Sequence, residues 1–364
     1  MTAPLDLLAA RLVRATAAVR DAGIDCLVVS APANLTYLAG LRMSAGHLVV
    51  GPAGATLVVD GRYVDAAGES LAGRSDLALE PVPVGSSYEE ATAALVRRLG
   101  ATSVGVESAH LTVGRLAAFQ RQLAGDTPVQ WRETTGIIES LRVIKDPWEC
   151  GVLRDAGGRL SAVAACILPK VSAGRTERQV AWDIDVALRS AGFERPAFET
   201  IVASGPHAAR PHHRPTDRRL ETAELVLLDF GGQLDGYSVD MSRTVPLGDV
   251  GSRRRHWLEA VAAAQLAAID AVAPGRLPSE VDAAARHRLG REGLADRFVH
   301  STGHGLGLDV HERPTIGPRG DTDGPLAAGM VFTVEPGVYV PGEGGVRIED
   351  DVLVTPAGAE RLTS

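Results

Sequence analysis

The sequence predicts an α+β protein of two domains: a compact α/β domain over residues 1–137 and a duplicated α+β domain over residues 138–364. Three observations lead to this prediction. The chain of 364 residues is long enough to form two hydrophobic cores. Helical and strand patterns alternate through its first part, as in α/β domains. One segment of its second part occurs twice, at an offset of 101 residues.

Composition and charge restrict the class of protein. The formal net charge of −8 disfavours a nucleic acid or an anionic membrane as partner. The three cysteines, Cys26, Cys150 and Cys166, form no C-x-x-C pair and fit a reducing compartment. Charged residues interrupt any signal-peptide pattern at the N-terminus, and no apolar run reaches the length of about 18 residues that a membrane span needs. We therefore expect a cytoplasmic protein that binds neither nucleic acid nor membranes.

The first domain shows clear helix and strand patterns. Apolar residues at helical spacing predict a helix that begins near Leu8 and ends at Gly23, and a buried strand follows over residues 24–29. The apolar runs 47–50 and 55–59 flank G-P-A-G and predict a hairpin. Helices over 88–99 and 113–123 then enclose a strand over 103–107. We place the domain boundary near residue 137, ahead of a helix that Asp146 and Pro147 begin and that runs to about Leu168.

The second domain contains an internal repeat. V-S-A-G-R-T-E-R-Q-V (171–180) matches V-A-P-G-R-L-P-S-E-V (272–281), and the match continues in register beyond both segments. Each copy predicts a turn followed by a helix, which ends at Gly192 in the first copy and at Gly293 in the second. Thr176 and Gln179 have the spacing of a capping box. The repeat predicts two halves related by a pseudo-twofold axis, with a site between them that takes residues from both.

The stretch from His300 to Pro314 holds three histidines within twelve residues. A helix is not expected here, because the three glycines at 303, 305 and 307 each cost about 1 kcal/mol relative to alanine in a helix interior. A glycine-flanked histidine on extended backbone instead indicates close approach to a ligand or a metal.

Four carboxylates end or follow apolar strand patterns. Residues 225–230 and 237–245 predict a hairpin, and a turn centred between Leu234 and Asp235 would place Asp229 directly opposite Asp240, with Cβ atoms about 4.5–5.5 Å apart. Two buried like charges at this distance require either protonation or a cation. Glu335 and Glu349 occupy similar positions after the second repeat.

These carboxylates and His304 form a plausible ligand set for metal ions. Two divalent cations neutralise four carboxylates, and five ligands suit a two-metal site. Carboxylate dominance favours Mn²⁺, with Co²⁺ and Zn²⁺ able to compete. Arg347 lies two residues before Glu349 and would point to the same face of a strand, where it is suited to hold a ligand carboxylate in place. Tyr237 is a candidate for substrate binding or for support of the ligands.

The motifs of the chain resemble those of the pita-bread metallopeptidases, in the branch of Xaa-Pro aminopeptidases (aminopeptidase P) and Xaa-Pro dipeptidases (prolidases). N-L-T-Y-L-A-G (34–40) and D-G-R-Y (60–63) resemble a creatinase-type N-terminal domain. L-D-F-G, D-M-S-R-T, H-x-x-G-H, H-E-x-P, E-P-G and R-I-E-D follow in the order of the family. The resemblance covers nearly the whole chain. It implies a creatinase-like α/β domain over 1–137 and a duplicated pita-bread catalytic domain over 138–364.

The resemblance also implies a role for each matching residue. The metal ligands would be Asp229, Asp240, His304, Glu335 and Glu349, with a hydroxide that bridges the two ions as the nucleophile. Glu335 would also act as the general base. Three further catalytic residues are implied: His212 would assist the transition state, and His300 and His311 would line the substrate pocket.

The expected activity is hydrolysis of the Xaa-Pro bond at the N-terminus of short proline-containing peptides, as by aminopeptidase P. The alternative is an Xaa-Pro dipeptidase, which needs a cation for the free C-terminal carboxylate; Arg210, Arg313 and Arg319 are candidates. A metal-free, creatinase-like amidinohydrolase is disfavoured because all five ligand residues are present, and a non-catalytic peptide-binding module is disfavoured because none of the five is lost. Family analogy implies a homodimer whose N-terminal domain reaches the cleft of the partner.

Overall fold

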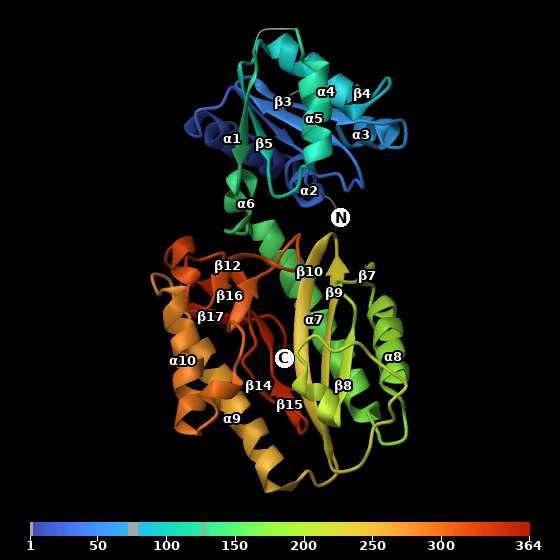
Figure 1. Ribbon diagram of the computed structural model, residues 1–364, viewed down its shortest axis with the longest axis vertical. Coiled ribbons are helices and arrows are strands. Elements are labelled where there is room, and N and C mark those ends of the chain that lie inside the picture. Colours follow the sequence, from blue (N-terminus) through green and yellow to red (C-terminus); the bar gives the residue numbers. More distant parts are fainter. Residues whose placement is uncertain (1–2, 72–78, 126–127) are drawn as a thin grey trace. The chain divides into compact units, whose positions relative to one another are not determined.

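A computed structural model describes residues 3–71, 79–125 and 128–364 (Figure 1). The chain divides into two compact units, Met1–Arg142 and Val143–Ser364. The boundary expected near residue 137 coincides with the start of helix α6 (Ile137–Arg142), which packs within the first unit. There the Tyr37 hydroxyl donates to the Leu141 carbonyl oxygen at 2.9 Å. No helix in the described ranges is long and apolar enough to cross a membrane.

The first unit is built on a six-stranded mixed sheet. Its strand order is β4-β3-β2-β1-β5-β6, in which β1, β2 and β3 pair antiparallel and the remaining neighbours pair parallel. The strands are β1 (Cys26–Val29), β2 (His47–Gly51), β3 (Gly54–Val59), β4 (Leu79–Pro83), β5 (Ser103–Glu107) and β6 (Gln130–Thr134). The helices that precede α6 are α1 (Leu5–Asp21), α2 (Pro32–Ala39), α3 (Val64–Leu71), α4 (Tyr88–Leu99) and α5 (Val113–Gln122).

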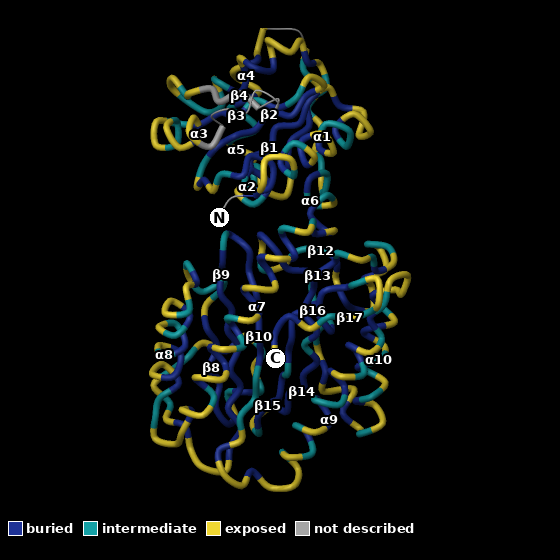
Figure 2. Tube along the Cα trace, turned by 180° about the vertical axis from the view of Figure 1, so that it is seen from behind, coloured by how far each residue is buried: buried dark blue, intermediate teal, exposed yellow. Residues whose placement is uncertain are grey.

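The elements predicted for this unit are confirmed. The predicted hairpin corresponds to β2 and β3, whose register ends with Gly51 paired to Gly54. The predicted strand over 103–107 has the bounds of β5, and α4 spans the predicted 88–99. Figure 2 shows the central strands as the most continuously buried part of the unit. The alternation of apolar runs and amphipathic stretches was therefore sufficient to place these elements.

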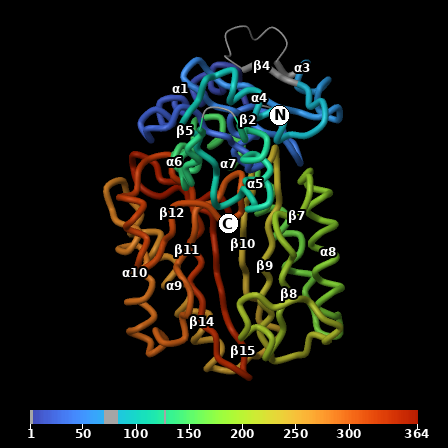
Figure 3. Tube along the Cα trace, turned by 45° about the horizontal axis from the view of Figure 1, so that its top comes forward, coloured from blue at the N-terminus to red at the C-terminus, as the bar shows by residue number. Residues whose placement is uncertain are grey.

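The second unit has four long helices outside two main sheets. Helices α7 (Pro147–Ile167) and α8 (Glu177–Ser190) flank one side, and α9 (Gly251–Asp270) and α10 (Pro278–Arg291) flank the other, with the strands between them (Figures 1 and 3). The first sheet has the order β10-β9-β7, with β8 also paired to β9; its strands are β7 (Arg195–Pro196), β8 (Ile201–Ser204), β9 (Glu224–Leu234) and β10 (Tyr237–Leu247). Strands β14 (Gly337–Val340) and β15 (Gly344–Arg347) pair with each other and form a separate two-stranded sheet.

The second main sheet has the order β12-β11-β13-β16-β17. Its strands are β11 (Gly303–Gly305), β12 (Glu312–Ile316), β13 (Val331–Val334), β16 (Asp350–Thr355) and β17 (Gly358–Arg361). His304 therefore lies on a strand, in agreement with the expectation that this stretch is not helical. A buried apolar cluster with Trp257, Val261 and Phe332 packs α9 and α10 against this sheet.

The internal repeat is visible in the helices. Helix α8 begins at Glu177 and ends at Ser190, and α10 begins at Pro278 and ends at Arg291, so both bounds differ by the offset of 101 residues found in the sequence. The predicted capping box is present, because the Gln179 amide donates to Thr176 Oγ1 at 3.2 Å and the Thr176 amide to Gln179 Oε1 at 2.9 Å. The expected α+β duplication is confirmed.

The register of the β9–β10 hairpin differs from the predicted one. Tyr237 pairs with Leu234, so the turn consists of Asp235 and Gly236, with φ of 49° and 87°. Asp-Gly favours this two-residue turn because both positions need positive φ. Asp240 consequently pairs with Gly231, and Asp229 with Ser242. The predicted direct opposition of Asp229 and Asp240 is therefore wrong: the two carboxylates lie diagonally on one face, at the longer spacing of about 7–8 Å that diagonal neighbours have.

Two adjacent glycines of α7 provide a test of this packing. A Cβ on Gly157 would lie 2.4 Å from the Leu362 carbonyl oxygen, whereas a Cβ on Gly158 would meet nothing within 4 Å. We expect Gly158→Ala to stabilise the protein by about 0.5–1 kcal/mol through helix propensity. Gly157→Ala should destabilise it by about 1–3 kcal/mol, because backbone must move. Urea unfolding checks both values, and equal shifts of one sign would contradict the packing described.

Candidate metal centre

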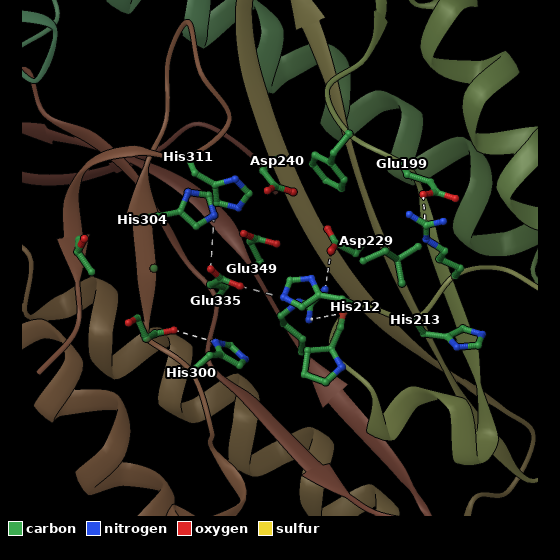
Figure 4. A pocket seen from close by; sticks show the side chains of 18 residues that line it. Glu199, His212, His213, Asp229, Asp240, His300, His304, His311, Glu335 and Glu349 are labelled. Carbon is green, nitrogen blue, oxygen red and sulfur yellow. Dashed lines mark hydrogen bonds and ion pairs between the residues drawn. The ribbon is translucent and has the colours of Figure 1, made fainter. Parts of the chain in front are cut away.

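The second unit contains a cavity of about 580 Å³ that receives side chains from both halves of the duplicated fold. The first half contributes β9 and β10 and the loop after β8. The second half contributes β11 and the segments that follow β13 and β15. This arrangement agrees with the shared site that the repeat predicts. Figure 4 shows the side chains that converge on it. Those of interest here are Asp229, Asp240, His304, Glu335, Glu349, Arg347, His212, His300 and His311.

Four carboxylates and a histidine meet inside the cavity. Asp240, His304 and Glu349 each offer a ligand atom within 4.8 Å of the other two. Glu335 lies beside His304, with 3.5 Å between Glu335 Oε1 and His304 Nε2. Asp229 borders the same cavity from β9. The structure thus brings together all five residues predicted as metal ligands.

The state of these carboxylates fits a site for cations. Asp229 Oδ1, Asp240 Oδ1 and Glu349 Oε1 are buried and have no hydrogen-bond partner among the described residues. A buried carboxylate oxygen without a partner is costly, and a metal ion supplies the missing interaction. His304 Nδ1 lies 3.1 Å from the Gly305 carbonyl oxygen. Because a carbonyl only accepts, Nδ1 carries the proton and Nε2 keeps its lone pair for a metal.

Crowding and burial change the pKa values of these groups in the protein without metal. Burial, followed by the nearby carboxylates of Glu349 and Asp229, raises the pKa of Asp240 well above its ordinary value. Burial and the carboxylates of Glu335 and Asp229 do the same for Glu349. Burial raises the pKa of Glu335 to about 8, against the opposing effect of the Arg347 guanidinium. These raised pKa values show that the ionised carboxylates are unfavourable in the protein without metal, and bound cations would stabilise the ionised form.

The guanidinium of Arg347 is a positively charged group within the carboxylate cluster. Its Nη2 donates to Asp229 Oδ2 at 2.5 Å, and its Nε donates to Ser242 Oγ at 2.7 Å. Ser242 Oγ in turn donates to Glu349 Oε2 at 2.7 Å. Arg347 therefore fixes one carboxylate directly and a second through a hydroxyl, which agrees with the predicted role of holding ligand carboxylates.

The predicted catalytic histidines differ in their surroundings. His300 accepts a hydrogen bond from Tyr339 at Nε2 (2.8 Å) and donates from Nδ1 to the Ser301 carbonyl oxygen (2.8 Å). Burial, with Arg347 nearby, lowers its pKa to about 4. His311 packs against His304 with its ring tilted by 50° and with 4.3 Å between ring centroids. His212 lines the cavity from the loop after β8 and is exposed.

Tyr237 does not reach the cavity. It is buried, its hydroxyl donates to Glu149 Oε1 at 2.8 Å, and its ring packs edge-on against Trp148. The expectation that Tyr237 binds substrate is therefore not supported. The side chain belongs to the packing between α7 and β10.

Several residues that contact the cluster were not predicted. Ser242 and Tyr339 link Arg347 to Glu349 and to His300. Asp351 accepts from the Asp240 amide at 3.0 Å. Alternation along a strand is the signal that could have identified two of them: Ser242 lies two residues after Asp240, and Asp351 lies two residues after Glu349. The pattern around Tyr339 gives no such indication, because its partners come from other strands.

Comparison with known proteins places this geometry in a family. Residues 152–356 match the model of metallopeptidase family M24, and residues 11–144 match the creatinase/prolidase N-terminal domain. The chain belongs to the M24 metallopeptidase family. As an M24 enzyme it is a metallo-exopeptidase with the pita-bread fold, and the family depends on two metal ions. The five converging side chains fit this requirement.

Individual relatives of this M24 enzyme carry the names of proline-specific peptidases and dipeptidases. The chain is 39% identical over 362 residues to the probable dipeptidase PepE of Mycobacterium tuberculosis, covering 97% of this chain and 94% of the relative. It is similar to the structure of the Xaa-Pro dipeptidase from Bacillus anthracis, with a TM-score of 0.92, 32% identity and 98% of each chain covered. It is also similar to the X-Pro aminopeptidase from Thermotoga maritima, with a TM-score of 0.84, 29% identity, and coverage of 96% and 97%.

Removal of one predicted ligand tests the metal centre. Asp240→Asn keeps the size of the side chain but removes its charge, so the protein should retain at most one of two bound ions. Metal content after Mn²⁺ loading and desalting, measured by inductively coupled plasma mass spectrometry, checks this result. Asp235→Asn, in the adjacent turn, is the matched control and should leave the metal content unchanged. Full metal content in Asp240→Asn would contradict the assignment.

Proposed function

We propose that the protein is an Xaa-Pro dipeptidase that uses two divalent ions, with Mn²⁺ as the preferred metal. The observation that carries the proposal is the convergence of Asp229, Asp240, His304, Glu335 and Glu349 in one cavity beside three further histidines. The preference for aminopeptidase P drawn from the sequence is not confirmed. Relatives named dipeptidase favour the alternative instead.

The metal ions, when bound, supply Lewis-acid activation of the substrate carbonyl and lower the pKa of a bound water. The side chains of the protein would hold the ions and transfer protons. Asp229, Asp240, His304, Glu335 and Glu349 would hold the ions, and Arg347 keeps Asp229 oriented for this role. Glu335 would take the proton of the attacking water, since its carboxylate lines the cavity beside the ligand His304.

Cleavage before proline needs a proton donor for the departing ring nitrogen, because an Xaa-Pro amide has no N–H. His212 and His311 border the cavity and are exposed enough to exchange protons with solvent. His300 is held in one neutral tautomer by Tyr339 and by the Ser301 carbonyl oxygen. We therefore assign His300 to the wall of the substrate pocket, and His212 and His311 to the transition state and the leaving group.

A dipeptide carries a free carboxylate close to the bond that is cleaved, and Arg214 is placed to receive it. Arg214 lines the cavity from the same loop as His212 and is strongly exposed, with Glu199 at 3.3 Å as its partner. The other arginine of the lining, Arg347, is occupied by Asp229 and Ser242. Arg210, Arg313 and Arg319, the candidates from sequence, do not belong to the lining, and Arg313 pairs with Asp323.

Hydrolysis of Gly-Pro and of Arg-Pro-Pro distinguishes the two activities. We expect the metal-free protein to be inactive and Mn²⁺ to restore cleavage of Gly-Pro, with little cleavage of the tripeptide. Release of proline, measured with Mn²⁺, Co²⁺ or Zn²⁺ added, checks the expectation. Preferential cleavage of Arg-Pro-Pro would establish aminopeptidase P instead. No cleavage of either peptide by protein with two bound ions would contradict the proline specificity.

Substitution of Arg214 tests recognition of the dipeptide carboxylate. Arg214→Ala should raise KM for Gly-Pro about 10-fold, as expected for a lost charge-assisted hydrogen bond, with a small effect on kcat. The effect should vanish with Gly-Pro amide, which lacks the carboxylate. Arg210→Ala removes an exposed arginine of the same loop outside the lining and should change neither value. An equal change in KM for both substrates would exclude this role.

A further inference from the structure

The loop after β8 carries His212 into the cavity, and its two ends converge on one buried carboxylate outside the metal centre. This carboxylate belongs to Glu177, the first residue of α8, whose side chain is completely buried. The loop extends from Ser204, the last residue of β8, to Thr216 and will be called the His212 loop. Among the proposed catalytic residues, His212 is the one that this loop positions.

Both oxygens of Glu177 are saturated by donors from the His212 loop. Oε1 accepts from the Ser204 amide at 2.9 Å, from Ser204 Oγ at 2.7 Å and from His207 Nδ1 at 2.9 Å. Oε2 accepts from His213 Nε2 at 3.0 Å, from the Thr216 amide at 3.0 Å and from Thr216 Oγ1 at 2.7 Å. One carboxylate thus joins the start, the middle and the end of the loop.

The same three groups have the spacing of metal ligands. Glu177, His207 and His213 each offer a ligand atom within 4.8 Å of the others. However, the two carboxylate oxygens already accept six hydrogen bonds, two of them from backbone amides. Burial alone would raise the pKa of Glu177, but hydrogen bonds from Thr216, Ser204 and His213 outweigh it and lower the pKa to about 2. The carboxylate is satisfied without a cation, in contrast to Asp240 and Glu349, which have unpartnered oxygens.

Of these hydrogen bonds, the one from His213 affects the cavity, because it determines where the neighbouring residue His212 lies. His212 and His213 are adjacent, and Figure 4 shows their side chains pointing in different directions, His212 toward the carboxylates and His213 away from them. His213 is buried and tied to Glu177, so the backbone at residue 213 has a fixed position and the ring of His212 is directed inward. A fixed backbone matters because a displacement of about 1 Å at a catalytic group costs on the order of 100-fold in rate.

We propose that Glu177 is a positioning residue that clamps both ends of the His212 loop and thereby directs His212 at the reacting groups. The inference rests on the proposed function for its kinetic part, since His212 is assigned there to the transition state. The clamp itself is a structural property that is measurable without substrate.

A double-mutant cycle tests the kinetic part. Glu177→Gln keeps the shape of the side chain but turns an amide NH₂ toward donors of the loop, so kcat for Gly-Pro should fall on the order of 10- to 100-fold. In the His212→Ala background the same substitution should have no further effect on kcat. The metal content of all variants should remain that of the wild type. Additive losses, or loss of metal in Glu177→Gln, would show a general structural role and overturn the proposal.

Asp217→Asn is the matched control for this cycle. Asp217 also joins this region to α8, through an ion pair of 2.6 Å with Arg178, but both side chains are strongly exposed. Exposed ion pairs contribute little to stability, so the kcat of Asp217→Asn should equal that of the wild type. A loss of kcat as large as that of Glu177→Gln would mean that any weakened tether to α8 has this effect, and would overturn the specific role of Glu177.

Hydrogen exchange tests the clamp independently of activity. In Glu177→Gln, amides of residues 204–216 should exchange faster than in the wild type, while those of β9 and β10 keep their rates. Thr216→Val should show a smaller increase and Thr216→Ser none, because serine restores the hydroxyl donor. Unchanged exchange in Glu177→Gln would overturn the clamp. If no Xaa-Pro peptide is hydrolysed but exchange increases as described, the proposed function fails while the clamp is supported.

Discussion

Electrostatic repulsion among buried carboxylates is the constraint on which the second unit depends. Four ionised carboxylates and the Arg347 guanidinium leave a net charge of −3 in the cavity, and two divalent ions would reverse it to +1. Without cations, burial first and the neighbouring carboxylates second raise the pKa values of Asp240, Glu335 and Glu349. Burying charges in this way opposes folding, so the surrounding fold must hold them in place. Bound cations would therefore offset the repulsion that the carboxylate cluster creates.

The duplicated fold explains how the chain supports such a cluster. The first half supplies two aspartates on one long hairpin, and the second half supplies the histidine on β11 and two glutamates in the short segments that follow β13 and β15. Helices flank the strands of each half, and in the second half an apolar cluster with Trp257 and Val261 packs α9 and α10 against the sheet. Arg347, Ser242 and Tyr339 then connect the halves by hydrogen bonds at the cavity.

Much of this arrangement could be predicted from sequence, because it depends on local patterns. A carboxylate that ends an apolar run, as Asp229 does, is informative by itself, and the offset of 101 residues predicted that α8 and α10 are equivalent helices. The hairpin register was predicted incorrectly because it is decided by the Asp235–Gly236 turn and not by the charges. The contacts of Tyr237 with Glu149 and Trp148 could not be predicted, because alternation gives the face of a strand but not what packs on it.

Contacts between distant segments could not be predicted. Arg347 and Asp229 are 118 residues apart, and Glu177 and His213 are 36 apart, so only the folded chain shows that they meet. The same limit applies to Arg214, whose place at the cavity follows from the path of the His212 loop. Sequence patterns thus identified the carboxylates and histidines that converge in the cavity, whereas Ser242, Tyr339 and Glu177, which contact them or their loop, required the structure.

The measurement that tests the account most directly is the anomalous scattering of a crystal of the protein grown with Mn²⁺. The account predicts two peaks about 3.5–4 Å apart, enclosed by Asp229, Asp240, His304, Glu335 and Glu349. It also predicts no peak at Glu177, His207 and His213, where the carboxylate is already satisfied. A single peak, or peaks outside the five residues, would contradict the two-metal centre and the role given to the carboxylate cluster.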